Sequence, residues 1–536
     1  MTALVRQAAW DARALPLGSA LLTGAAIILS AVAILSGSFW MPAALFGAAC
    51  VYCLVFRNWK WGILGLLAYL PFSGIPALLL YPAPGIVVLL KDLLFVIPAY
   101  LAFVLGAAPK RRGRSFFFPG APVALICALA VVVCLGLLNP SLLSPMVGLI
   151  GVKVWLFYVP LYFLGYHLVE SKASLVRLLR TILWVGMLSV LIGLLETVLL
   201  YTGHSDAVYG ALGPAAQAAT QEFAGFVVGG GQTLVRIPGT FTFVTQYWAF
   251  LFGMLAIGFS VWAASERQGE RLRGIYPVFV AMITVAALTS GARAAMVMVP
   301  AFYLLVMAVG LGWRSSLRSV LLIAGAIAVV ITLLGTTARD LFRFVGAVVA
   351  VYSGTEGGIA QETVRVFASS WLMGLGTGMS TGPARYAFAG GDPTGSLASF
   401  EGYYTKTIAE LGILGIVVVV ALLSRILFLG YRAFRQLRDG VLRVVGGCLF
   451  VYMILEVLSL VKGAAALDLD PSNIYFWLFG GVLMKLPSLE LSQEVVVSIP
   501  RQSRGVSYRT LASMVMRMIL DKESPRRGSP ADAALL

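Results

Sequence analysis

Long apolar runs alternate with short polar connections along most of the chain. The runs are continuous rather than alternating, which favours membrane helices over the strands of a membrane barrel. Pro71 and Pro76 are expected to kink the third run. We therefore expect an all-α, polytopic integral membrane protein with about fourteen spans, at residues 18–36, 41–56, 62–80, 86–107, 120–138, 146–168, 180–201, 241–263, 275–291, 294–312, 318–335, 405–424, 442–461 and 472–487.

Two connections are much longer than the others, at about residues 202–240 and 336–404. The second contains amphipathic stretches, 340–352 and 362–373, which predict helices lying at the membrane surface. The pattern divides the chain into a transmembrane domain, 1–487, and a basic tail, 488–536, whose end is expected to be disordered.

Composition and charge support this organisation. The chain is 60% hydrophobic and only 12% charged over 536 residues, with a mean hydropathy of +0.93, which excludes an ordinary soluble enzyme. A net charge of +16 is typical of a nucleic-acid-binding protein, but the positions of the charges along the chain give another explanation. Most Lys and Arg residues then fall in alternate connections, so we expect these connections and both termini to be cytoplasmic, and no nucleic-acid partner.

Membrane proteins carry few basic residues in connections on the outer side of the membrane, so each basic residue in the remaining, predicted outside connections requires an explanation. Arg236 stands just before a span and Arg293 lies between two spans, so both are expected near the outer membrane boundary. Clustered guanidinium groups there suit a phosphate or pyrophosphate, because their planar fork binds phosphate oxygens bidentately. Snorkelling to lipid headgroups is the alternative. The outside set comprises Arg236, Arg293, Arg339, Arg343, Arg365, Arg385, Lys406 and Lys462.

Several charged side chains fall inside predicted spans. Lys91 and Asp92 are adjacent, so on a helix they point about 100° apart and can pair with other helices. Lys153 lies toward the outer end of its span and could join the arginines, or pair structurally with Glu196. Charges at this depth could also belong to the ion pathway of a transporter. The set is Lys91, Asp92, Lys153, Glu196 and Glu456.

The segment before the twelfth span carries a further group of polar residues. Lys406 and Glu410 are four residues apart, so they can pair on one helix face. Glu401 stands just before the helix, where its carboxylate could act as a general base on a hydroxyl. The alternative is that it only stabilises the helix N-terminus by charge–dipole attraction.

Histidine and cysteine offer little for metal chemistry. The chain has two histidines and five cysteines, and the cysteines all lie in apolar runs without a histidine at metal-ligand spacing. Cys50 and Cys53 have the spacing of a C-x-x-C motif, but inside a span they are better explained as small packing residues. We expect no metal site and no cofactor.

Four motifs, in this order, resemble those of O-antigen ligases and Wzy-type polysaccharide polymerases. They lie within about residues 85–485, and the larger outside loop begins after the second. Arg236–Phe241 opens a span, Thr289–Ala295 resembles a Ser-Arg-Gly-type signature, Gly374–Gly378 resembles a glycine-rich segment, and Ala409–Gly415 resembles a Glu-x-Gly-Leu-Leu-Gly helix start.

The resemblance implies a metal-independent, integral-membrane glycosyltransferase. Its donor would be an undecaprenyl-pyrophosphate-linked glycan, with Arg236 and Arg293 on the pyrophosphate and Lys153 and Arg365 as further donor-binding residues. Many family members place a His nine residues before the motif glutamate, and this chain has Glu401 there. Glu401 and Arg293 are therefore the candidate catalytic residues. The supporting residues are Tyr403, Lys406 and Glu410.

The resemblance also implies a location and partners. We expect a multi-pass protein of the bacterial inner membrane whose active site faces the periplasm, acting as an exopolysaccharide or O-antigen polymerase. An O-antigen ligase or a protein O-glycosyltransferase would differ only in the acceptor. A transporter or flippase for lipid-linked oligosaccharide is the alternative of another class. Partners are the lipid-linked donor, an acceptor glycan, membrane lipid, and a chain-length regulator or export proteins.

Overall fold

The computed structural model describes residues 40–80, 87, 89–107, 116–204, 207, 225–228, 232–270, 274–309, 325, 359–370, 372–381, 384, 400, 402–461 and 467–498. This part is helical apart from one two-stranded antiparallel ribbon. Its helices include six that are long and apolar enough to cross a membrane, at Pro145–Leu168, Lys172–Leu200, Val244–Gln268, Tyr403–Gln436, Gly440–Ser459 and Ser472–Leu491. The helical class and the apolar, membrane-type helices are as expected.

The first part of the chain forms short helices with breaks near prolines. The predicted span 62–80 divides into three pieces around Pro71 and Pro76, because proline lacks the N–H of a helix interior. The predicted span 146–168 is interrupted before Pro160 for the same reason. The elements are α2 (Trp40–Arg57), α3 (Lys60–Tyr69), η1 (Leu70–Phe72), α4 (Ile75–Leu79), the π-helix η2 (Asp92–Val96), α6 (Ile97–Ala107), α7 (Val123–Gly136), α8 (Pro145–Leu156) and α9 (Leu161–Leu168).

The second part contains the longer helices. α10 begins at Lys172, earlier than the predicted 180, because Ser171 and Ser174 form a reciprocal capping box. The elements are α10 (Lys172–Tyr201), β1 (Gly225–Val228), β2 (Gln232–Val235), α13 (Val244–Gln268), α14 (Ile275–Thr289), α15 (Arg293–Ala308), α18 (Ile359–Ser370), α20 (Tyr403–Gln436), α21 (Gly440–Ser459) and α22 (Ser472–Ser498).

Three details differ from the sequence expectations. The ribbon β1–β2 lies inside the connection 202–240, where no strand was expected. α20 contains a break at Gly412, whose backbone is not helical. α22 continues through Pro487 to Ser498, so the first residues of the predicted tail are helical. The predicted span 18–36, the predicted span 318–335 apart from residue 325, and the stretch 340–352 lie outside the described residues, as does the tail beyond Ser498.

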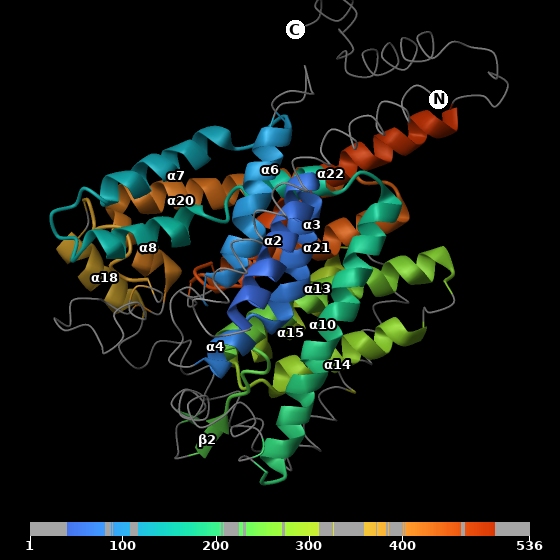
Figure 1. Cartoon of the computed structure of the whole chain (residues 1–536), viewed down its shortest axis with the longest axis horizontal. Helices are drawn as coiled ribbons and strands as arrows, with labels where there is room; N and C mark the ends of the chain where they lie inside the picture. The colour runs from blue at the N-terminus through green and yellow to red at the C-terminus, as the bar shows by residue number, and fades with distance from the viewer. Residues whose placement is uncertain are drawn as a thin grey trace, which may run out of the picture.

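The core is centred on α13, which is buried along most of its length and packs against α10, α14 and α21 (Figure 1). A second close contact joins α9 to α22, where the backbones touch. A Cβ on Gly165 would lie 2.2 Å from the Leu478 carbonyl oxygen, and a Cβ on Gly481 would lie 2.0 Å from that of Tyr162. Glycine at both positions lets these helices approach closely, as small residues do in membrane bundles.

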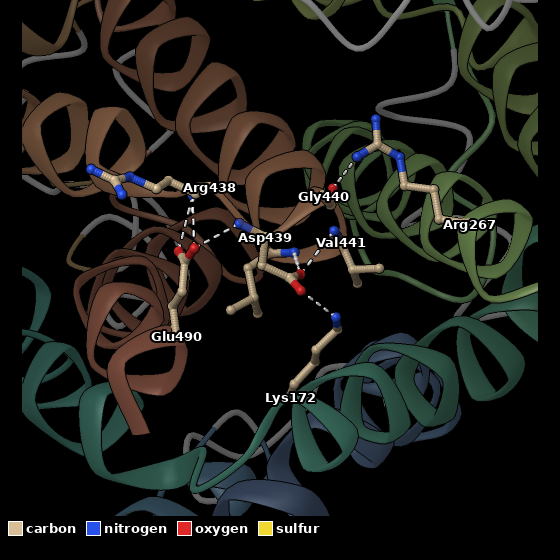
Figure 2. A network of polar contacts seen from close by, with 8 residues as sticks. Lys172, Arg267, Arg438, Asp439, Gly440, Val441 and Glu490 are labelled. Carbon is tan, nitrogen blue, oxygen red and sulfur yellow. Dashed lines mark hydrogen bonds and ion pairs between the residues drawn. The ribbon is translucent and has the colours of Figure 1, made fainter. Parts of the chain in front are cut away.

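Polar contacts at one end of the bundle join segments that were all predicted to be cytoplasmic. Figure 2 shows Lys172 from α10, Arg267 from α13 and Glu490 from α22 converging on the connection between α20 and α21. Lys172 pairs with Asp439 at 2.6 Å, and Glu490 accepts the backbone N–H groups of Arg438 and Asp439. Arg267 donates to the Gly440 carbonyl.

At the other end, polar contacts join predicted outside segments with each other or with the predicted outer ends of spans. The Ile237 N–H donates to the Ser290 carbonyl at 3.1 Å, and the Tyr403 N–H donates to the Leu460 carbonyl at 3.0 Å. The Asn139 side chain donates to the Gly374 carbonyl at 3.0 Å. The α18 helix, which overlaps the predicted surface-helix stretch 362–373, lies at this end beside α20 (Figure 1).

Asp439 gives a first prediction, because its carboxylate both caps α21 and pairs with Lys172. It accepts the Val441 and Leu442 N–H groups at 3.0 Å. Burial acts to raise the pKa of Asp439, but the Lys172 and backbone hydrogen bonds outweigh it and lower the pKa. Asp439→Ala should therefore cost about 1 kcal/mol of stability at neutral pH.

The sign of the pH dependence follows from the lowered pKa. The stabilisation is present above the unfolded pKa of about 3.9 and is lost as the pH falls through the folded pKa. Thermal unfolding of wild type and Asp439→Ala in detergent, compared at neutral pH and in acid, measures it. The difference in melting temperature between the two proteins should become smaller in acid. A difference that does not change with pH would contradict the stabilising role of the Asp439 carboxylate.

Candidate functional site

The structure brings the first two motifs together. The Ile237 N–H bonds to the Ser290 carbonyl, so the turn that begins at Arg236 lies against the end of α14. Arg236 is partly buried there. Arg293 is the first residue of α15, three residues after Ser290, and its side chain lies outside the described part of the structure. Two arginine-bearing segments that are far apart in sequence therefore meet at one place.

The turn after Arg236 is held by contacts with two other elements, α10 and η1. Glu196 of α10 accepts the Gly239 N–H at 2.9 Å. Thr240 donates to the Pro71 carbonyl and lies 2.6 Å from the Ser189 hydroxyl oxygen. Glu196 thus fixes the arginine turn rather than pairing with Lys153, and that pairing, one of the sequence alternatives, is wrong.

A buried cluster of lysines and aspartates lies between η2, α8 and the start of α22. Lys91 pairs with Asp470 at 2.7 Å, and Lys153 pairs with Asp92 at 2.7 Å. Lys91 is 3.8 Å from its neighbour Asp92, so both residues find their closer partners on other segments, as expected. Tyr158 donates to Asp92 at 2.6 Å. The positive charge of Lys153 is therefore compensated in this structure, and its side chain is 31% exposed.

Lys406 and Glu410 do not pair with each other. Lys406, fully buried, forms an ion pair with Asp468, and its ammonium group lies 4.9 Å from the centre of the Trp155 ring. Tyr403 packs against the same indole, with ring centres 5.4 Å apart. The i,i+4 spacing permits the expected pairing, but tertiary contacts supply closer partners to both residues.

Glu410 instead binds the glycine-rich motif. Its carboxylate accepts the Gly378 N–H at 3.1 Å, the Ser380 N–H at 2.8 Å and the Trp155 indole N–H at 2.7 Å. The side chain is fully buried. The third and fourth motifs are therefore two halves of one arrangement, in which a buried carboxylate fixes a glycine-rich turn.

The glycine-rich segment Gly374–Thr381 is irregular, yet its backbone donors are all satisfied. Every N–H from Gly374 to Thr381 donates to an acceptor within the protein. The acceptors are carbonyls of Ser370, Ala409, Glu410, Gly136, Gly376 and Gly378 and the Glu410 carboxylate. Irregular backbone is tolerated at membrane depth only where the protein buries and pairs it in this way. In this conformation the turn offers no free amide to a phosphate.

Close packing explains why glycine is required in this segment. Gly378 has φ +94°, and a Cβ there would lie 2.2 Å from the Val147 carbonyl oxygen of α8. Gly412, at the break in α20, has φ +66°, and a Cβ there would lie 2.4 Å from the Leu372 carbonyl oxygen. Thr377 donates to the Val133 carbonyl of α7 at 2.7 Å. The segment is thus packed among α7, α8 and α20.

The remaining predicted site residues are distributed as follows. Arg365 lies on the exposed side of α18, whose other side, with Val366, packs against Ile408 and Ala409 of α20. Glu401 lies outside the described residues. Sequence reasoning missed the partners Trp155, Tyr158, Asp468 and Asp470. The run Asp468-Leu-Asp470-Pro, directly before a span, was the available signal for two of them.

Comparisons of the chain with known protein families and with curated proteins find no match. The likeness to ligases and polymerases therefore rests on the four sequence motifs alone.

Proposed function

We propose that the protein is a membrane-embedded glycosyltransferase that polymerises a bacterial polysaccharide from a polyprenyl-pyrophosphate-linked glycan. The observation that carries the proposal is the contact between Ile237 and Ser290, which brings the segments of Arg236 and Arg293 together. The pairing of Glu410 with the glycine-rich turn supports it, because two further motifs then form one unit.

The proposal includes fourteen spans, both termini in the cytoplasm and a site that faces the periplasm of the inner membrane, covered by the loop 336–404. Its support is the partition of polar contacts. Lys60 with Glu170, Lys172 with Asp439 and Arg180 with Glu270 join only predicted inside segments. The contacts of Ile237, Tyr403 and Asn139 join predicted outside segments with each other or with the predicted outer ends of spans.

In the proposed reaction, an acceptor sugar hydroxyl attacks the anomeric carbon of the donor glycan. The bond from that carbon to the pyrophosphate oxygen breaks, and negative charge grows on the departing polyprenyl pyrophosphate. Arg236 and Arg293 stabilise this charge through bidentate hydrogen bonds in a partly dehydrated site. Glu401 takes the hydroxyl proton. Arg365 of α18 contributes further positive charge to the pyrophosphate site. Lys153 contributes less, because its charge is already compensated by Asp92.

A transporter for lipid-linked oligosaccharide is the second candidate, favoured by one observation. The charges of Lys91, Asp92 and Lys153 are buried or partly buried where helices are irregular, at the π-helix η2 and near the break between α8 and α9. Broken helices with buried charges are typical of transporter binding sites. A ligase or a protein O-glycosyltransferase would use the same site with a different acceptor.

Reconstitution of the purified protein with lipid-linked repeat units tests the proposal. Wild type should produce a ladder of longer glycans. Arg236→Ala and Arg293→Ala should each lower the rate by about 10²–10³-fold, because each removes a group that stabilises the transition state. Arg177→Ala, an exposed arginine on α10, is the matched control and should retain full activity.

The other outcomes of this assay are equally informative. Loss of extension in Glu401→Gln supports its role as base, and an unchanged rate removes that role. Movement of the lipid-linked glycan across the bilayer without formation of a ladder would contradict the enzymatic function and support the transporter. Transfer to lipid A core or to a protein acceptor, without extension, would identify the ligase or the protein O-glycosyltransferase.

A further inference from the structure

The last turns of α20 carry a row of arginines and aromatic residues at helical spacing, which we call the basic stripe. Its members are Arg425, Phe428, Tyr431, Arg432 and Arg435. All five side chains are exposed, including 49% of Phe428 and 44% of Tyr431. Spacings of three and four residues place them on one face of the helix.

The aromatic rings of the stripe hold the guanidinium groups. Arg425 and Arg432 both lie over the Phe428 ring, at 5.7 and 5.8 Å from its centre. Arg435 lies 5.8 Å from the centre of the Tyr431 ring. Cation–π contacts of this kind restrict the arginine side chains without neutralising them. The stripe therefore presents ordered positive charge with its hydrogen-bond donors available.

The acidic side chains at this end of the bundle are already engaged elsewhere. Asp439 pairs with Lys172, and Glu270 pairs with Arg180. Glu490 accepts backbone N–H groups of the α20–α21 connection. In the described ranges, the ion pairs found include none of the three stripe arginines.

The predicted cytoplasmic segments outside the described ranges carry more basic than acidic residues. Residues 108–115 and 310–324 contain basic residues and no Asp or Glu, and the sequence after residue 498 is net basic. The stripe also follows a lipid-type surface on the same helix, since the exposed side chains of Leu414, Val417 and Val420 are aliphatic. A change from aliphatic to aromatic and basic side chains marks the membrane–water boundary.

The length of α20 agrees with this placement. Its continuous part after the break at Gly412, Ile413–Gln436, spans about 36 Å, whereas the hydrocarbon core is about 30 Å thick. The final turns therefore reach the headgroup layer. We propose that the basic stripe binds the phosphate groups of anionic phospholipids in the leaflet at this end of the bundle. Arg425 and Arg432 are about 10 Å apart along the axis, so the stripe can bind more than one phosphate.

The test uses the full chain in nanodiscs that contain phosphatidylglycerol and phosphatidylcholine in equal amounts. After extraction into mild detergent, native mass spectrometry measures which lipids remain bound. Each basic residue near the surface contributes about a five-fold preference for anionic lipid. Wild type should retain phosphatidylglycerol preferentially, and the triple variant Arg425→Gln, Arg432→Gln, Arg435→Gln should lose most of that preference. Arg177→Gln, at the same end but outside the stripe, should bind as wild type does.

Equal retention of the two lipids by wild type would overturn the proposal, and so would an unchanged preference in the triple variant. Displacement of the lipid by millimolar inorganic pyrophosphate would show that a soluble anion is the ligand, which also overturns it. Equal melting temperatures of wild type and triple variant in phosphatidylcholine alone verify that the substitutions leave the fold intact. The result does not depend on the proposed enzymatic function.

Discussion

Glu410→Ala is expected to abolish glycan extension while the protein still inserts in the membrane. The substitution leaves the N–H groups of Gly378, Ser380 and Trp155 without their acceptor in a buried site. Each unpaired buried donor costs about 1–3 kcal/mol. The glycine-rich segment should therefore leave its place among α7, α8 and α20, and α18 should move with it. Glu410→Gln should fail similarly, because its amide NH₂ faces donors rather than acceptors.

Cysteine labelling measures this release directly. Ser380→Cys, in a background without the five native cysteines, should be protected from a membrane-impermeant maleimide, because Ser380 is 4% exposed. Adding Glu410→Ala should make it reactive. Glu490→Ala is the matched control, since Glu490 also accepts backbone N–H groups but at the opposite end. If Ser380→Cys stays protected in Glu410→Ala, the Glu410 carboxylate does not hold the glycine-rich segment in place.

The second large effect is expected for the ion pair between Lys406 and Asp468. Lys406 is fully buried and Asp468 nearly so. Asp468→Asn should destabilise the protein by about 3–5 kcal/mol, because it leaves a buried charge uncompensated. A fall in the melting temperature in detergent, with loss of activity at lower temperature than wild type, is the expected measurement.

A double substitution separates charge from packing in this prediction. Adding Lys406→Met to Asp468→Asn removes the uncompensated charge, so most of the lost stability should return. Glu170→Gln serves as the surface comparison, because Lys60 and Glu170 form an exposed pair. Its effect should stay within about 0.5 kcal/mol. Equal losses for Asp468→Asn and the double variant would show that the pair acts through shape alone.

The sequence predicted the helical membrane class well because apolar runs and prolines act locally. The positions of α13 and α21 and the breaks at Pro71 and Pro76 follow from residues within each segment. The earlier start of α10 also has a local cause, the Ser171 cap, which the pattern of apolar runs does not include. The strands of the ribbon, only four residues each, left no hydrophobic run to identify.

The candidate site was harder to predict because its contacts are tertiary. The sequence placed Lys406 and Glu410 on one helix, and spacing suggested a pair. Their partners, Asp468 and the amides of Gly378 and Ser380, lie 30–62 residues away along the chain. Nothing local distinguishes a carboxylate that binds a lysine from one that binds a turn. The resemblance singled out the third and fourth motifs separately, and only the structure shows that they contact each other.

The backbone contact between α9 and α22 has a consequence for biogenesis. Gly165 on α9 and Gly481 on α22 let the two backbones touch, so each helix has a surface that fits closely against the other. The ribosome makes α22 about 300 residues after α9, which takes roughly 15–60 s at ordinary synthesis rates. During that interval α9 has no permanent neighbour on this face, and lipid, a chaperone or the insertion machinery must cover it. Completion of the bundle therefore waits for the last described helix, and a nascent chain stalled before Ser472 would be recognisable to quality-control proteases.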